Sequence, residues 1–224
     1  MTMTTAPRGA TTILLIRHGE TAWNAERRLQ GHLDIPLNAE GERQAALLGG
    51  ALAGEAIDHV LSSDLGRARQ TAEAILRARG ATTAVQVDPQ LRERCYGGFE
   101  GLLYSEIAAR YPADFAAWQA RNVDATLPPG KNHGESFRAF FDRVTTAIAA
   151  HAARHPGQTL ALVAHGGVLE CAYRAALGLS LDTPRDFKVH NASINRFAVE
   201  QGKLRLTSWG EVDHLRQPAL DELP

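Results

Sequence analysis

Apolar residues occur along the chain in two alternating patterns. Short runs of consecutive apolar residues, many of them β-branched, separate longer segments in which apolar residues recur at helical spacing. The short runs are typical of strands buried on both faces of a parallel sheet, and the longer segments are typical of helices that cover it. The predicted strands of this kind lie over residues 11–16, 57–61, 84–87 and 158–164.

The helical segments carry recognisable start and stop signals. Asn38 and Ser136 can each accept a hydrogen bond from a free backbone N–H at a helix start. Gly80 and Gly178 are typical of residues that end a helix. The predicted helices lie over residues 38–53, 65–79, 104–110, 112 onward, 136–154 and 168–177.

Two further strands are predicted near the end of the chain. The segments 193–199 and 204–209 flank Gln201 and Gly202, which indicates an antiparallel hairpin at a sheet edge. Strands that alternate with helices indicate an α/β fold with a mostly parallel sheet covered on both faces. We therefore predict a three-layer αβα sandwich with an antiparallel edge strand, in which reactive groups lie beyond the carboxyl ends of the strands.

One folding unit accounts for most of the chain. A sequence of 224 residues with 44% hydrophobic composition can bury a full core without disulfides. We predict a disordered tail over residues 1–10 and a single domain over residues 11–224. The pattern is irregular around residues 98–134, which predicts a lid or insertion there.

Charge and cysteine content narrow the range of partners. The formal net charge is -1, and no basic stripe points to nucleic-acid binding. The apolar run 13–16 is too short to span a membrane. Cys95 and Cys171 have no metal-ligand spacing, which favours a reduced, cytoplasmic protein without a metal site. His151 and His155 share one predicted helix but lack a third ligand, so they are interpreted as surface residues.

Two histidines directly follow two of the predicted strands. The segment 17–20 (Arg-His-Gly-Glu) follows the first strand, and His165 follows the strand that ends at Ala164. Because parallel strands can bring such ends to one crevice, we expect His18, His165 and Arg17 to form a cationic pocket. The planar guanidinium of an arginine binds two phosphate oxygens at once, so the pocket predicts a phosphate substrate.

The same residues suggest a phosphohistidine mechanism. If a backbone carbonyl holds one ring nitrogen of His18, the other lone pair can attack a phosphate ester. Arg67 lies in the first turn after the second strand, where the helix N-terminus adds positive charge. Glu93 follows the third strand and fits a general acid that protonates the leaving group. Arginines and a protonated histidine can stabilise the phosphoryl group, so a metal is not required.

The segments that carry these residues resemble, in order, the histidine phosphatase superfamily, also called the phosphoglycerate-mutase-like family. The matching segments are 15–24, 62–71, 91–101, 134–136 and 164–167. The resemblance spans nearly the whole chain and implies the phosphoglycerate-mutase-like fold. The segments 27–31 and 210–223 are similar to the shorter bacterial branch, which is labelled as a second phosphoglycerate mutase and of which several members behave as phosphatases.

The resemblance implies roles for individual residues. By this resemblance, His18 is the phosphorylated nucleophile and Glu93 is the proton donor. The residues that hold the phosphate are Arg17, Arg67 and His165. Further substrate-binding residues that border the pocket are Asn24, Gln30, Gly31, Tyr96 and Gly166.

The resemblance leaves phosphatase and mutase activities open. The segment 93–97 is similar to the mutase version of the acid segment, in which Tyr96 touches substrate. However, Tyr104 stands where mutases carry a substrate-binding lysine, and residues 112–131 lack their paired arginines. Loss of several charge-assisted contacts, at roughly 1.5 to 3 kcal/mol each, would let a doubly anionic intermediate escape. We therefore favour a phosphatase, although other arginines could replace those contacts: Arg94, Arg110 and Arg121.

The expected activity is hydrolysis of a small phosphorylated metabolite without a metal or cofactor. The alternative is a cofactor-dependent phosphoglycerate mutase that interconverts 2- and 3-phosphoglycerate, with 2,3-bisphosphoglycerate as primer. A third hypothesis is a non-catalytic protein that binds phosphorylated ligands and has kept only the fold. Nucleic-acid and membrane partners are not expected, and both a monomer and a homodimer remain open.

Overall fold

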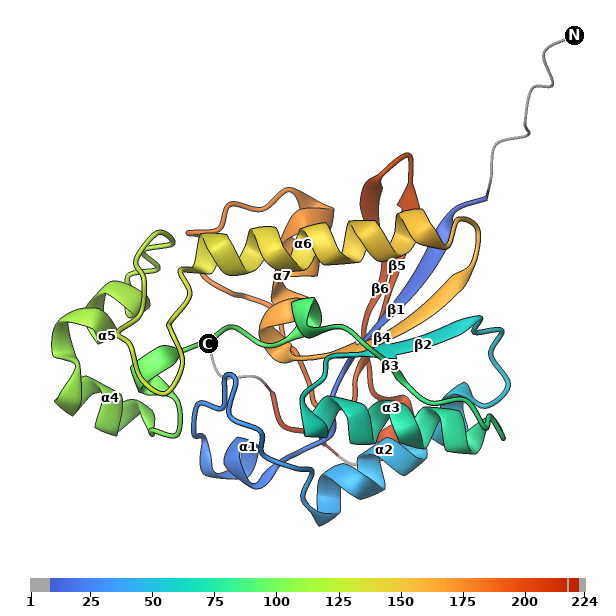
Figure 1. Ribbon diagram of the computed structural model, residues 1–224, viewed down its shortest axis with the longest axis horizontal. Coiled ribbons are helices and arrows are strands. Elements are labelled where there is room, and N and C mark those ends of the chain that lie inside the picture. The colour runs from blue at the N-terminus through green and yellow to red at the C-terminus, as the bar shows by residue number, and fades with distance from the viewer. Residues whose placement is uncertain (1–8, 217, 222–224) are drawn as a thin grey trace, which may run out of the picture.

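The computed structural model describes residues 9–216 and 218–221 and shows an α/β fold (Figure 1). One sheet contains six strands in the order β3-β2-β4-β1-β5-β6. The strands are β1 (Thr11–Arg17), β2 (His59–Ser62), β3 (Gln86–Val87), β4 (Thr159–Ala164), β5 (Ile194–Glu200) and β6 (Lys203–Glu211). The described α-helices are α1 (Ala22–Glu26), α2 (Ala39–Leu52), α3 (Gly66–Ala78), α4 (Tyr104–Arg110), α5 (Pro112–Gln119), α6 (Phe137–Arg154) and α7 (Gly166–Leu177).

The sheet is parallel on one side of β1 and antiparallel on the other. β1 pairs in parallel with β4, β4 with β2, and β2 with β3. β5 pairs antiparallel with both β1 and β6. Gln201 and Gly202 join β5 to β6 with φ values of 52° and 75°, as a two-residue hairpin turn requires. The predicted fold class is confirmed.

Consecutive residues of β1 face opposite sides of the sheet, and helices cover each side. Ile13 and Leu15 are fully buried in one hydrophobic cluster, which includes residues of α6 and α7. Leu14 and Ile16 are fully buried in a second cluster, which includes residues of α2 and α3. Figure 1 shows these two helix pairs on opposite sides of the strands. Burial on both faces explains why the first strand is an uninterrupted apolar run.

Capping residues set the helix boundaries much as the sequence predicts. Asn38 Oδ1 accepts a hydrogen bond from the Gly41 N–H at 2.8 Å. Ser136 Oγ accepts one from the Ala139 N–H at 3.1 Å. Gly178 ends α7 in the left-handed region with a φ of 65°. These contacts satisfy backbone groups that helix ends otherwise leave unpaired.

The middle of the chain packs around an aromatic cluster of its own. Figure 1 shows α4 and α5 lying to one side of the sheet. The buried residues of this cluster are Leu29, Phe99, Ile107 and Leu127. The aromatic residues packed against them are Tyr96, Tyr104, Tyr111, Phe115 and Trp118. The predicted helices after Tyr104 and Pro112 are present. The lid role of residues 98–134 stays a prediction.

Two local features differ from the sequence interpretation. The five residues of α1 are too few for a periodic pattern, and a capping box between Thr21 and Asn24 defines the helix instead. His151, interpreted as a surface residue, is only 3% exposed, and its Nε2 lies 2.7 Å from Asp88 Oδ2. That interpretation of His151 is wrong, because the side chain joins α6 to the segment after β3.

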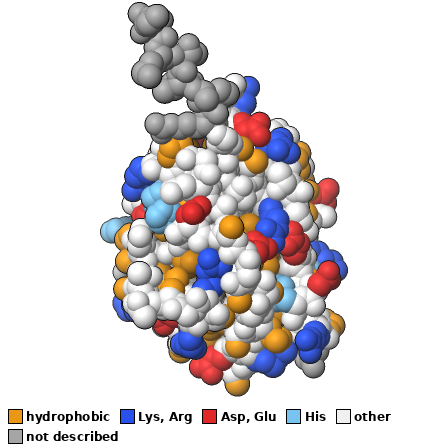
Figure 2. Space-filling model, turned by 90° about the vertical axis from the view of Figure 1, so that its right-hand side faces the viewer, with side chains coloured by type: hydrophobic (Ala, Val, Ile, Leu, Met, Phe, Trp, Pro, Cys, Tyr) orange, Lys and Arg blue, Asp and Glu red, His pale blue; other side chains and the backbone are white. Residues whose placement is uncertain are grey.

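The first described residues of the chain lie outside the core. Residues 1–8 of the predicted tail lie outside the described residues, and Gly9 and Ala10 are exposed. Within the described part of the chain, no helix has the length and apolar character to cross a bilayer. Figure 2 shows one face of the molecule, on which acidic and basic side chains are interspersed.

Candidate active site

His18 and His165 lie at the carboxyl ends of two neighbouring strands. Arg17, the last residue of β1, is in register with Ala164, the last residue of β4. Because the two strands are parallel, the residues that follow them enter one crevice. The two imidazole centroids are 5.2 Å apart, with 61° between the ring planes. The structure therefore brings the two histidines together, as the strand ends predict.

The His18 imidazole has the protonation state that a nucleophile requires. Its Nδ1 lies 2.6 Å from the Gly19 carbonyl oxygen. A carbonyl oxygen only accepts hydrogen bonds, so Nδ1 carries the proton and Nε2 keeps its lone pair. Burial lowers the pKa of His18 well below its usual value, and the charges of Arg67 and Arg17 lower it further. The ring is therefore neutral at neutral pH.

Distant parts of the chain fix the loop that carries His18. The Gly19 N–H donates to Thr71 Oγ1 of α3 at 3.1 Å. Asn191 Nδ2 donates to the His18 carbonyl oxygen at 3.0 Å, and the His18 N–H donates to the Ala164 carbonyl oxygen at 3.0 Å. These bonds hold the backbone on both sides of the imidazole, so the ring is positioned before a ligand arrives.

Two buried arginines share the pocket with His18. Arg17 is fully buried, and its Nη1 donates to the Val189 carbonyl oxygen at 2.6 Å. Arg67 comes from the first turn of α3, and its Nη2 donates to the Gly31 carbonyl oxygen at 2.8 Å. Both side chains line the pocket around His18. Carbonyl contacts orient the guanidinium groups and leave their positive charge in place, which suits a phosphate.

His165 has the character of a ligand-binding group. The residue is fully buried, and neither ring nitrogen has a hydrogen-bond partner among the described residues. Burial lowers the pKa of His165 well below its usual value, and the charge of Arg67 lowers it further. This shift favours the neutral form of His165 over the protonated form that the sequence predicts. A neutral His165 can still donate one hydrogen bond to a phosphate oxygen, and a bound dianion would favour its protonation.

Glu93 enters the same pocket from the segment after β3, and its carboxyl oxygens are both held in place. Oε1 accepts from the Arg94 N–H at 2.8 Å, and Oε2 accepts from the Gly167 N–H at 3.0 Å. The residue is 6% exposed and lines the pocket with His18 and Arg67. A fixed carboxyl group beside the two cationic side chains can exchange a proton with an ester oxygen or with water.

The pocket also contains most of the residues predicted for substrate binding. Those that line it are Asn24, Gln30, Gly31 and Tyr96. Gln30 Oε1 accepts from Thr21 Oγ1 at 3.0 Å, which fixes its side chain. Gly166 and His165 are not among the lining residues: Gly166 begins α7, and the His165 ring makes an edge contact with the His18 ring.

Sequence reasoning missed several residues of this pocket. The lining residues without a predicted role are Trp23, Arg28, Leu29 and Asp221. Asp221 lines the pocket because residues 218–221 lie beside residues 189–191. Its Oδ1 accepts from the Val189 N–H at 2.6 Å, and the Leu220 carbonyl oxygen accepts from the Asn191 N–H at 2.9 Å. The only feature of the sequence that pointed to Asp221 was the family resemblance of residues 210–223. That resemblance did not indicate that the segment contributes to the pocket.

Gly167 leaves room for the Glu93 carboxyl group. A Cβ at this position would collide with Glu93 Oε1 and would lie 2.9 Å from Phe140 Cε1. We expect Gly167→Ala to displace the carboxyl group and to lower kcat by about 10- to 100-fold. Gly50→Ala is the matched control, because a Cβ on this exposed residue of α2 meets nothing within 4 Å. Steady-state assays that give both variants wild-type kcat would refute this role for Gly167.

The remaining reactive side chains do not suggest other chemistry. Among residues 9–216 and 218–221, no group of three or more His, Cys, Asp or Glu side chains is placed to hold a metal ion. Burial raises the pKa of the Cys95 thiol to about 11. The thiol is therefore protonated at neutral pH, which agrees with its interpretation as a packing residue.

The chain is similar to known proteins along most of its length. The sequence profile of the histidine phosphatase superfamily (branch 1) matches residues 13–212. Phosphoglycerate mutase-like protein 4 of Arabidopsis thaliana is 39% identical over 207 residues, which cover 92% of this chain and 87% of that protein.

Solved structures of similar proteins have the same fold as this chain. Bacillus stearothermophilus YhfR matches with a TM-score of 0.82 and 34% identity over 92% of this chain and 100% of that chain. The alpha-ribazole phosphatase from Shigella flexneri matches with a TM-score of 0.76 and 29% identity over 89% of this chain and 96% of that chain. The chain therefore belongs to the histidine phosphatase superfamily, whose members are phosphatases or phosphotransferases.

Proposed function

We propose that this protein hydrolyses the phosphate monoester of a small metabolite through a phosphohistidine on His18. One observation carries the proposal: the Nδ1 contact with the Gly19 carbonyl oxygen leaves the Nε2 lone pair of His18 for attack, in a pocket that also contains two arginines and Glu93. The superfamily and the alpha-ribazole phosphatase among its structural relatives support the same class of reaction.

In the first step, His18 Nε2 attacks phosphorus in line with the ester oxygen. A bond forms between Nε2 and phosphorus, the bond to the ester oxygen breaks, and the protonated Glu93 carboxyl group gives its proton to the leaving alkoxide. Arg17, Arg67 and His165 bind the remaining phosphoryl oxygens and stabilise their charge. The Nδ1–H bond to the Gly19 carbonyl oxygen stabilises the positive charge that the ring acquires.

In the second step, water takes the place of the departed alcohol. The Glu93 carboxylate accepts a proton from the water molecule while the water oxygen attacks phosphorus. The bond between phosphorus and Nε2 breaks, which releases inorganic phosphate and restores the neutral His18. Glu93 is protonated again and ready for the next ester, so atoms and protons balance over the cycle.

Further properties follow as proposals from the same site. We propose that no metal ion or cofactor is needed, because buried arginines supply the positive charge that metal ions supply in other phosphoryl-transfer enzymes. We propose a cytoplasmic location, which is supported by the two buried cysteines being free thiols. Monomer and homodimer both remain predictions.

A phosphoglycerate mutase is the second candidate function. The mutase-like name of the Arabidopsis relative favours it, as does the place of Tyr96 in the phosphate pocket. A mutase would pass the phosphoryl group from His18 to a phosphoglycerate rather than to water, with 2,3-bisphosphoglycerate as primer. Such an enzyme must retain its bisphosphorylated intermediate, whereas a phosphatase releases the alcohol after the first step.

One set of assays separates the candidate functions. We expect release of inorganic phosphate from phenyl phosphate in the presence of EDTA. A mutase would instead convert 3-phosphoglycerate and the primer to 2-phosphoglycerate faster than it releases phosphate. A protein that produced neither product would be a non-catalytic binder of phosphorylated ligands, and loss of activity in EDTA would contradict metal independence.

A further inference from the structure

A larger pocket adjoins the phosphate pocket. Its volume is about 390 Å³, within the range of sites that enclose most of a drug-sized molecule. Leu29 and Tyr96 line both pockets, so the two spaces share a wall. We call the larger space the side pocket. Its size exceeds what the three-carbon body of a phosphoglycerate can fill.

Glu93 stands between the two pockets. Its carboxyl group lines the phosphate pocket, and its Oε2 accepts a hydrogen bond from the N–H of Gly167, which lines the side pocket. Under the proposed function, Glu93 protonates the ester oxygen of the substrate. The group attached to that oxygen must therefore leave the phosphate pocket beside Glu93, where the side pocket begins.

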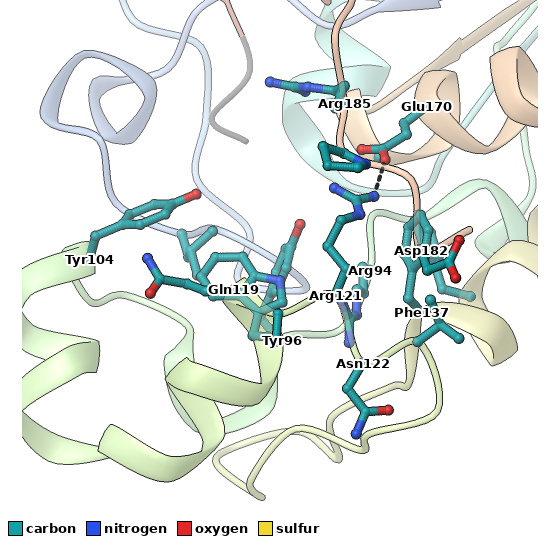
Figure 3. Close-up of a pocket in the computed structure, with 17 residues that line it drawn as sticks. Arg94, Tyr96, Tyr104, Gln119, Arg121, Asn122, Phe137, Glu170, Asp182 and Arg185 are labelled. Atoms are coloured by element: carbon teal, nitrogen blue, oxygen red, sulfur yellow. Dashed lines mark hydrogen bonds and ion pairs between the residues drawn. The ribbon is translucent and has the colours of Figure 1, made fainter. Parts of the chain in front are cut away.

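Aromatic rings form much of the side pocket wall. Figure 3 shows Tyr104, Gln119 and Tyr96 on one side of the space and Phe137 on the other. The ring of Trp118 lies 6.0 Å from that of Tyr96 and 5.3 Å from that of Tyr104, measured between centroids. Such surfaces favour a flat, apolar ligand, because rings bury large areas and pack well against other rings.

Arg94 gives the side pocket a buried positive charge. The residue is 5% exposed, and its Nε and Nη2 both donate to the Glu135 carbonyl oxygen. Its guanidinium lies 5.7 Å from the ring centroid of Tyr96 and 5.8 Å from that of Phe137. Within the described part of the chain, no carboxylate forms an ion pair with Arg94. Burial accordingly lowers the pKa of Arg94.

The other charges of the side pocket do not cancel that of Arg94. Arg121 is paired with Glu170, whose Oε1 lies 2.7 Å from Arg121 Nη2, as the dashed line in Figure 3 marks. Glu170 also pairs with Arg174 of the same helix. The carboxylates of Glu135 and Glu93 favour the charged form of Arg94, but neither forms an ion pair with its guanidinium. An anion in direct contact with the guanidinium would therefore stabilise this charge further. A buried cation without an ion-pair partner is costly unless a ligand supplies the opposite charge.

We propose that the leaving group of the natural substrate is a flat, apolar alcohol bearing a carboxylate, and that this carboxylate pairs with Arg94 in the side pocket. The inference rests on the proposed phosphatase function and narrows its substrate class. The apolar body lies between the rings of Tyr96, Trp118 and Phe137, and the ester oxygen stays beside Glu93. The phosphate and the carboxylate thus occupy separate cationic sites.

Two isosteric esters test the proposal on the intact protein. We expect wild-type kcat/KM for 4-carboxyphenyl phosphate to exceed that for 4-carbamoylphenyl phosphate by about 10- to 100-fold, the effect of one buried charge-assisted contact. Arg94→Gln should reduce this ratio to about one, and Arg94→Lys should keep part of it because the charge remains. Arg138→Gln is the matched control, since Arg138 is exposed and pairs with Asp124 outside both pockets.

Each outcome bears on one hypothesis. If neither ester is hydrolysed, the proposed phosphatase function fails. If wild-type protein hydrolyses both esters equally well, the proposed substrate class fails while the phosphatase function stands. If Arg94→Gln folds and keeps the wild-type ratio, Arg94 does not bind the carboxylate. If circular dichroism shows that Arg94→Gln does not fold, the role of Arg94 is judged from the wild-type ratio and from the ratio of Arg94→Lys. In addition, 4-hydroxybenzoate should inhibit the wild-type protein more strongly than 4-hydroxybenzamide does.

Discussion

His18→Ala should lower kcat for phenyl phosphate by at least about ten-thousand-fold. The substitution removes the nitrogen that forms the bond to phosphorus, and hydrolysis by a single displacement would lack a positioned nucleophile. KM should change much less, because Arg17 and Arg67 remain to bind the phosphate. Rapid quenching of wild-type protein with ³²P-labelled phenyl phosphate should trap acid-labile label on a histidine, and the variant should carry none.

His133→Ala provides the matched control for this substitution. His133 is an exposed residue of the segment before α6 and lines neither pocket. This variant should retain wild-type kcat and wild-type labelling. If His18→Ala kept a tenth of the wild-type rate, or if its label remained, another residue would have to be the nucleophile.

The place of His18 and His165 could be predicted because it depends on a general property of parallel sheets. Each residue follows an apolar run that is buried on both faces, and the carboxyl ends of such strands lie at one edge. The sequence did not establish that β1 and β4 are neighbours. That adjacency comes from the strand order, in which Arg17 and Ala164 are in register.

Other parts of the site could not be predicted, because long-range contacts create them. Asn191 reaches the carbonyl oxygen of His18 across 173 positions of sequence, and no local pattern marks it. Asp221 lines the pocket only because residues 218–221 pair with the segment before β5. His151 was interpreted as a surface residue because no third metal ligand was apparent. Its partner Asp88 comes from another segment of the chain, and no local pattern indicates this contact.

The electrostatic state of the site also differs from what residue types suggest. A histidine beside a phosphate site is expected to be protonated, but burial and two nearby arginines lower the pKa of both His18 and His165. The same arginines that attract the phosphate therefore keep the His18 ring neutral before the phosphate binds. Attraction of the substrate and nucleophilicity of His18 thus have a common structural cause.

Glu93→Gln should affect poor leaving groups far more than good ones. The amide keeps the size of the side chain but cannot give a proton to an alkoxide. We expect kcat for an alkyl ester such as 3-phosphoglycerate to fall by about a thousand-fold, and the rate of bond cleavage in 4-nitrophenyl phosphate to fall by only about 10-fold, because nitrophenolate leaves without a proton. Glu42→Gln, at an exposed position of α2, should leave both rates unchanged.

The same substitution should separate the two steps of the reaction. Glu93 also takes a proton from water in the second step, so the phosphohistidine should hydrolyse slowly in Glu93→Gln. Stopped-flow mixing with 4-nitrophenyl phosphate should then show a burst of about one nitrophenolate per active site, followed by a slow steady state. A variant that showed no burst and lost the same fraction of its rate with both esters would contradict a role for Glu93 in proton transfer. The loss of rate would then come from a displacement of the backbone at Arg94 and Gly167, because the N–H groups of both residues donate hydrogen bonds to the Glu93 side chain.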